Sequence, residues 1–260
     1  MLDKQPLTLA STADRYGALY AKAYLGRAEC ARNMSMYKQA EMYLIRAKKV
    51  CQYRLDRNHI VKAEVLTCEG HLLMMRCSFK EARGVVSEAI SIRLLNFGNS
   101  HPQLATSYIQ LAHVCVHEYN YTEAERLVES ASEMRKEFYC ESLGTQNHPG
   151  AANSEYCLGK VCMLVEKFPQ AIEHFKESQK IFGATLSKDH PAQVAPLLGL
   201  GEVYRLQGLI TLAEKCLSEA LQIQNAYFAT SDDRTHLFIG HTMQQLALCA
   251  VYCGKLRRAK

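Results

Sequence analysis

Several features that mark other protein classes are missing from this 260-residue chain. Tryptophan is absent, proline occurs only six times, and no apolar run approaches the roughly 18 residues that a membrane span needs. We therefore expect no membrane insertion. Because 48% of the residues are hydrophobic and proline is scarce, the composition favours packed helices over a β-sandwich or a disordered chain.

The sequence also lacks the cysteine spacing of a zinc site. It has eleven cysteines but no Cys-x2-Cys pair, and the nearest pairs are Cys249 with Cys253 and Cys157 with Cys162. No secretory signal peptide is recognisable at the start of the chain. We therefore predict reduced structural thiols in a cytoplasmic protein, with no metal site.

The charge pattern argues against a nucleic-acid partner. The formal net charge is +5, and it is spread along the chain. The only dense basic runs lie at residues 46–49 and 255–260, which is too little for a nucleic-acid-binding surface.

Catalytic motifs are missing as well. There is no phosphate-binding loop, and Gly199-Leu200-Gly201 lacks the third glycine of a dinucleotide loop. His117-Glu118 begins like a zinc-protease helix, but the second histidine ligand is replaced by Tyr121. The sequence therefore predicts no catalytic residues, no cofactor and no enzyme activity.

A regular period runs through the chain. Five histidines each stand 23 residues before an alanine, and three of them are followed by proline. The histidines are His59, His101, His148, His190 and His236. The alanine series, extended back by one step, is Ala40, Ala82, Ala124, Ala171, Ala213 and Ala259, with intervals of 42, 42, 47, 42 and 46 residues. A period of this size is typical of stacked helical repeats.

Other positions recur within the period. If the alanine is position 20, position 8 is always glycine or alanine and position 17 is always large and apolar. We interpret each unit as a hairpin of two helices, in which the small residue at position 8 faces the alanine at position 20. The residues at position 17, predicted to begin the second helices, are Tyr37, Phe79, Tyr121, Phe168, Ile210 and Leu256.

The histidines mark where the first helix of each hairpin begins. Proline fits the first position of a helix because its fixed φ is helical and the missing N–H would have no partner there. The residue before each His-Pro pair is Ser100, Asn147 or Asp189, and we predict that these side chains cap the helices.

This pattern resembles the tetratricopeptide repeat (TPR), and most closely the 42-residue type of kinesin light chains and nephrocystin-3-like proteins. The stretches that carry the resemblance run from His101-Pro102 to Leu127 and from His190-Pro191 to Glu214. The resemblance implies an all-α fold, a right-handed α-solenoid of antiparallel helix hairpins with about six TPR units, the last incomplete. We expect a single solenoid over residues 1–260, with units at 15–56, 57–98, 99–145, 146–187, 188–233 and 234–260.

Three departures from the repeat are visible. Position 7, usually leucine in the family, is Arg27 and Glu69 in the first two units. Extra residues fall at 139–147 and 226–233, and we place both insertions in loops between hairpins. The last unit stops without its second helix, so we expect either a fragment or a chain that a partner completes.

In the resembling family the first helices line a concave groove that binds peptides. Apolar side chains with sparse polar groups suit a peptide or helix laid along such a groove. The groove candidates here are Arg32, His71, Met75, Ile109, His113, His117, Tyr156, Lys160, Met163 and Arg205. An alternative is that some of these, such as Met163, are simply core.

Two binding modes of the family find little support in these residues. Kinesin light chains carry an asparagine ladder beside position 6, where only Gln110 and Gln245 could substitute here. The carboxylate clamp of chaperone-binding repeats needs lysine at position 5 and asparagine at position 9, and neither occurs.

The functional reading is a non-enzymatic scaffold or adaptor that binds a protein segment, with a microtubule, motor or ciliary setting implied by the resemblance. Two alternatives remain open. The chain is a structural subunit packed permanently in a larger assembly, or it is the regulatory TPR segment of a longer enzyme.

Overall fold

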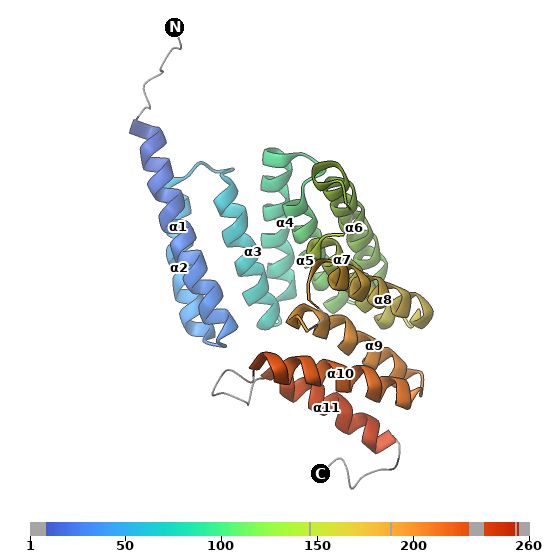
Figure 1. The fold of residues 1–260 in the computed structure, drawn as a ribbon. Coiled ribbons are helices and arrows are strands. Elements are labelled where there is room, and N and C mark those ends of the chain that lie inside the picture. Colours follow the sequence, from blue (N-terminus) through green and yellow to red (C-terminus); the bar gives the residue numbers. More distant parts are fainter. Residues whose placement is uncertain (1–8, 146, 188, 229–236, 253, 255–260) are drawn as a thin grey trace. The chain divides into compact units, whose positions relative to one another are not determined.

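The computed structural model describes residues 9–145, 147–187, 189–228, 237–252 and 254 (Figure 1). Within them it holds eleven α-helices, one short 3₁₀ helix and no strand, the all-α architecture of helix hairpins that the sequence predicts. The helices are α1 (Leu9–Asn33), α2 (Tyr37–Arg54), α3 (Ile60–Met75), α4 (Phe79–Phe97), α5 (Pro102–His117), α6 (Tyr121–Leu143), α7 (Pro149–Leu164), α8 (Phe168–Thr185), η1 (Pro191–Gln193), α9 (Val194–Leu206), α10 (Ile210–Phe228) and α11 (Leu237–Tyr252).

The chain divides into two compact units. Unit 1 spans Met1–Asn120 and contains α1 to α5, and unit 2 spans Tyr121–Lys260 and contains α6 to α11. In unit 1, α1 pairs with α2 and α3 with α4, and α3 also packs against α1 and α2. In unit 2, the hairpins α7–α8 and α9–α10 pack against each other, and α11 packs on α9 and α10. The boundary falls inside the predicted repeat 99–145, so the six-unit division of one solenoid stays a prediction.

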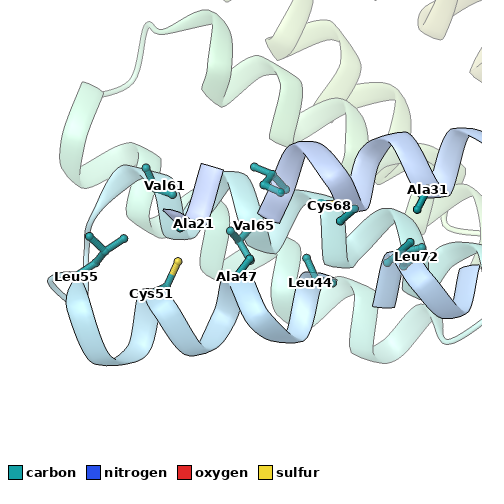
Figure 2. Close-up of a cluster of buried hydrophobic side chains, with 13 residues drawn as sticks. Ala21, Ala31, Leu44, Ala47, Cys51, Leu55, Val61, Val65, Cys68 and Leu72 are labelled. Atoms are coloured by element: carbon teal, nitrogen blue, oxygen red, sulfur yellow. The ribbon is translucent and has the colours of Figure 1, made fainter. Parts of the chain in front are cut away.

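The core of unit 1 forms where three helices converge. Small and medium apolar side chains of α1, α2 and α3 meet in one cluster that includes Ala21, Leu44, Ala47, Val65 and Leu72 (Figure 2). Ala21 and Ala47 are fully buried, which allows the helices to approach closely.

The predicted starts of the second helices are confirmed for every described hairpin. Helices α2, α4, α6, α8 and α10 begin at Tyr37, Phe79, Tyr121, Phe168 and Ile210. Two residues earlier, at position 15, the chain turns through the left-handed backbone region. The residues there are Ser35, Cys77, Tyr119, Glu166, Gly208 and Gly254, with φ between 59° and 76°.

The predicted helix caps are wrong, because the histidines themselves are the caps. Nδ1 of His101 accepts a hydrogen bond from the backbone N–H of Gln103 at 3.2 Å, and His148 accepts from Gly150 at 3.0 Å. His59 and His190 cap α3 and η1 in the same way. In each case the imidazole accepts a hydrogen bond from the backbone N–H two residues later, which is the capping bond of the helix. The side chains of the preceding residues, Ser100, Asn147 and Asp189, are therefore not needed as caps.

The glycine at position 8 lies against a large apolar side chain of the second helix. A Cβ atom added to Gly159 would lie 2.6 Å from Phe175, and one added to Gly201 would lie 2.7 Å from Leu217. Both partners are at position 24, one helical turn beyond the alanine at position 20. The absent side chain therefore makes room for a large apolar residue of the second helix.

The loop prediction for the first insertion is also wrong in part. Helix α6 continues to Leu143 and has 23 residues, whereas α2 and α8 have 18. The added turn is held because Tyr139 is 8% exposed and stacks on His148, with ring centroids 3.7 Å apart. Predictions for His236, Leu256 and Ala259, and for most of the insertion at 226–233, lie outside the described residues.

Candidate functional site

Three of the groove candidates in unit 1 influence one another. Arg32, His71 and His113 lie on α1, α3 and α5, the first helices of successive hairpins. Burial, with the positive charges of Arg32 and His113, lowers the pKa of His71 to about 4. At neutral pH His71 is therefore uncharged.

The other three candidates of unit 1 lie in different surroundings. His117 is exposed and stacks on Phe79, with ring centroids 4.6 Å apart and planes 9° from parallel. Ile109 is 6% exposed and belongs to the interior. Met75 is 53% exposed and lines a pocket between α2 and α3.

That pocket has a volume of about 420 Å³ and an apolar floor that includes Leu44, Leu72 and Leu73. Two ion pairs line it and join the helices, Lys48 with Glu69 at 2.7 Å and Arg76 with Glu41 at 2.9 Å. The charges of Lys48 and Arg76 are therefore already neutralised by carboxylates of the protein itself.

Ion pairs also tie successive first helices to each other. In unit 1, Lys22 of α1 lies 3.6 Å from Glu64 of α3, and both occupy position 2. In unit 2, Lys160 of α7 lies 3.3 Å from Glu202 of α9, and both occupy position 9. A ligand that uses Lys160 must therefore compete with Glu202.

The remaining candidates of unit 2 differ in exposure. Met163 is 5% exposed and packs in the core with Phe175 and Leu200, which supports its alternative reading as core. Tyr156 packs against Phe175, and burial raises the pKa of its phenol to about 12. Arg205 lies 6.0 Å from the ring centroid of Tyr252, and its Nε is buried without a hydrogen-bond partner.

Gln110, a possible substitute for the asparagine ladder, has a structural role. It is 2% exposed, and its Nε2 donates to the carbonyl of Thr67 at 2.7 Å. Its amide joins α5 to α3 and is not available to grip a ligand backbone.

Sequence reasoning missed a charged network in unit 2. Glu155 of α7 is 3% exposed and accepts hydrogen bonds from Ser132 at 3.1 Å, Lys136 at 2.7 Å and His174 at 2.9 Å. Burial alone would raise the pKa of Glu155, but hydrogen bonds from His174 and Lys136 lower it to about 2. Hydrogen bonds with Cys162 and then Glu155 raise the pKa of His174 to about 9.

Hydrogen bonds join the thiol of Cys162, the imidazole of His174 and the carboxylate of Glu155 in series, as in a cysteine hydrolase. Cys162, however, is 2% exposed and packs in the hydrophobic core with Phe175. A substrate could not reach the thiol without unfolding that core, so the arrangement serves packing. The periodicity gave no signal for it, because Glu155 and His174 do not recur in other repeats.

A second set of buried charges recurs with the period. Arg93 and Arg135 each stand eleven residues after the repeat alanine and are 4% and 5% exposed. Arg93 donates to Thr67 at 2.8 Å and also to Ser107, and Arg135 donates to Ser154 at 3.0 Å. Each arginine therefore joins a second helix to the first helix of the next hairpin.

Two other kinds of site have no candidates in the described part of the chain. Its histidines, cysteines and carboxylates form no group of three that could hold a metal ion. Of its helices, none combines the length and apolar character needed to cross a membrane.

Comparison with known proteins agrees with the hairpin architecture. The tetratricopeptide repeat family model matches residues 150–226, which cover α8, η1 and α9 in full and most of α7 and α10. No curated protein matches the chain.

Solved structures share the fold at low identity. A Podospora anserina protein with nearly identical kinesin light chain TPR-like repeats is 18% identical, with a TM-score of 0.62, over 83% of this chain and 99% of its own. The quorum sensor NprR of B. thuringiensis in its apo form is 17% identical, with a TM-score of 0.64, over 98% of this chain and 64% of its own. A Rap protein complexed with Competence and Sporulation Factor is 15% identical, with a TM-score of 0.67, over 94% of this chain and 72% of its own.

The family match identifies TPR-type repeats over residues 150–226, and these neighbours support the TPR fold for the chain. The finer assignment to the 42-residue kinesin light chain and nephrocystin-3-like type remains a prediction from the sequence.

Proposed function

We propose that this chain of TPR-type hairpins is a protein-interaction scaffold that binds a peptide or helix along its first helices. The observation that carries the proposal is the set of partly or fully exposed arginine, lysine, histidine and tyrosine candidates on those helices. Arg32, His71 and His113 provide it in unit 1, and Tyr156, Lys160 and Arg205 provide it in unit 2. The Rap neighbour, solved as a complex, supports a binding role for this fold.

The test is peptide selection followed by charge reversal. An acidic peptide selected from a random library against the purified chain should bind more weakly to the Lys160→Glu/Arg205→Glu variant, by about tenfold, because two favourable charges become repulsive. The matched control is Lys180→Glu/Lys215→Glu, which makes the same charge change at exposed sites of α8 and α10. An equal loss of affinity in both variants would show that net charge, and not this surface, determines binding.

We also propose a microtubule, motor or ciliary setting for the scaffold. The support is the 42-residue interval with His-Pro at helix starts, together with a structural neighbour that has kinesin light chain TPR-like repeats. Co-sedimentation with polymerised microtubules, alone and with a purified kinesin heavy chain, tests this setting. Failure to sediment under either condition would remove the motor setting and leave the scaffold proposal intact.

A further inference from the structure

The first hairpin has a second candidate binding surface on another face. In unit 1, α1 and α2 contact each other and α3, and they lie at the edge of the unit away from α4 (Figure 1). On α1, Tyr16, Leu19 and Tyr20 are 62%, 63% and 60% exposed. Their spacing of three and four residues places them on one stripe, which Arg27 continues.

Helix α2 presents a matching stripe. Met42 and Tyr53 are 41% and 77% exposed, and Arg46, four residues after Met42, is exposed between them. We call the surface formed by Tyr16, Leu19, Tyr20, Arg27, Met42, Arg46 and Tyr53 the tyrosine–arginine face.

Two arginine–tyrosine contacts show that the stripes are neighbours. The guanidinium of Arg27 lies 4.3 Å from the ring centroid of Tyr43 and donates to its hydroxyl at 2.7 Å. Arg46 lies 6.0 Å from the ring centroid of Tyr24. A guanidinium held over a ring in this way is restrained but still has N–H groups free for a carboxylate.

Two carboxylates of this hairpin act on the neighbouring helix α3. Glu41 pairs with Arg76 of α3, and Glu29 acts on Cys68 of α3. Within the described residues, no carboxylate lies within ion-pair distance of Arg27 or Arg46. Helix α2 carries five basic residues against one acidic residue, so the face is cationic as well as aromatic.

We propose that the tyrosine–arginine face docks an acidic protein segment that also carries apolar side chains. Exposed tyrosine and arginine are the residues that dominate protein interfaces, and the unpaired guanidinium groups select carboxylates. A nucleic acid would leave the aliphatic Leu19 and Met42 unused. A second copy would bring two cationic faces together, which repel. The face shares no residue with the groove candidates, and the candidate of the same helix, Arg32, acts electrostatically on His71 of α3.

The test uses a labelled helical peptide of about 20 residues, with glutamates on one face and leucines on the other, in fluorescence anisotropy. Parallel titrations use the same peptide with alanine for leucine and a single-stranded DNA of similar length. The Glu/Leu peptide should bind most tightly, with an affinity that falls as salt rises from about 50 to about 300 mM. DNA binding that is tighter than peptide binding, or no peptide binding at about 1 mM, would overturn the proposal.

Variants locate the binding site. Arg27→Glu/Arg46→Glu should weaken the Glu/Leu peptide by at least about tenfold, whereas Lys180→Glu/Lys215→Glu, with the same charge change at exposed sites outside both candidate surfaces, should leave it within about twofold. Since Arg27 and Arg46 contact tyrosines of the hairpin, circular dichroism melts must accompany this variant.

If that variant does not fold, Tyr16→Ser/Tyr20→Ser gives a second readout at exposed sites. It should reduce binding of the Glu/Leu peptide and barely change the weaker binding of the Glu/Ala peptide. Equal losses for both peptides would contradict the apolar part of the proposal. A doubled mass by light scattering that Arg27→Glu/Arg46→Glu abolishes would instead identify a second copy as the occupant.

Discussion

Each described hairpin turns through a single residue in the left-handed backbone region, and the residue type there varies. Position 15 is glycine in Gly208 and Gly254 but a non-glycine residue in the first four hairpins, including Cys77 at φ 60°. A residue with a Cβ is disfavoured at this φ, whereas glycine adopts it without steric cost. The turn geometry therefore persists where the local residue opposes it, because the helices on both sides are packed.

Cys77→Gly should stabilise the protein. Relief of the strained backbone outweighs the greater chain entropy of glycine, so we expect a gain of about 0.5–1 kcal/mol and a rise in melting temperature of about 2–4 °C. Cys77 is exposed, so little packing is lost. Gly208→Ala is the reverse change at the same position and should lower the melting temperature. If both variants melt like the wild type, the turns do not have the described backbone geometry.

At the histidine caps, the sequence predicts where the helices begin but not which residue caps them. The period of His101 and His148 locates the helix starts correctly, but the caps were assigned to Ser100 and Asn147, which are the usual capping residue types. What decides between them is the reach of Nδ1 to the backbone N–H two residues later, at 3.2 and 3.0 Å, and this depends on the side-chain rotamer. The rotamer is fixed by stacking on Phe97 and Tyr139, contacts between helices that a sequence pattern does not show.

At the scale of elements, glycine sets the distance between the two helices of a hairpin. Gly201→Ala should cost about 1–3 kcal/mol, because the new methyl group would overlap Leu217 at 2.7 Å in a closely packed interior. Leu217→Ala alone should cost about 2–5 kcal/mol through the cavity it leaves. In the double variant the overlap is removed, so the combined loss should be smaller than the sum of the two, as measured by urea unfolding. Strict additivity would mean that the two residues do not meet.

The Glu155 network joins α6, α7 and α8, and its histidine predicts a dependence on pH. The pKa of His174 is raised from its ordinary value of 6.5 to about 9, so the folded state binds the proton more tightly than the unfolded state. The resulting stability is fully present below pH 6.5 and is lost as pH rises through 9. The free energy of unfolding should therefore fall across this interval, and His174→Gln should flatten the decline. His241→Gln, at an exposed histidine of α11, should keep the wild-type slope.

At the scale of the whole molecule, the period predicts the hairpins well but does not show which candidate side chains are exposed. Positions 8, 17 and 20 recur because the two helices of every hairpin pack against each other in the same way. Six repetitions of this pattern are enough to identify the hairpins. The groove candidates were chosen by register alone, and the register does not distinguish an exposed Met75 from a buried Met163. It also gave no sign of the cationic first hairpin, because the ion pair of Glu41 with Arg76 depends on the way α2 packs on α3.

The prediction of one solenoid over residues 1–260 is testable through cooperativity. In a stack whose neighbouring repeats share interfaces, stability passes from repeat to repeat, and a short array unfolds in a single transition. Methyl NMR signals of Met75 in unit 1 and Met163 in unit 2 should therefore lose intensity at the same urea concentration. Gly201→Ala, which acts in unit 2, should shift both midpoints together. Separate midpoints, with only the Met163 signal shifted by Gly201→Ala, would show that residues 1–120 and 121–260 fold as independent domains rather than as one array.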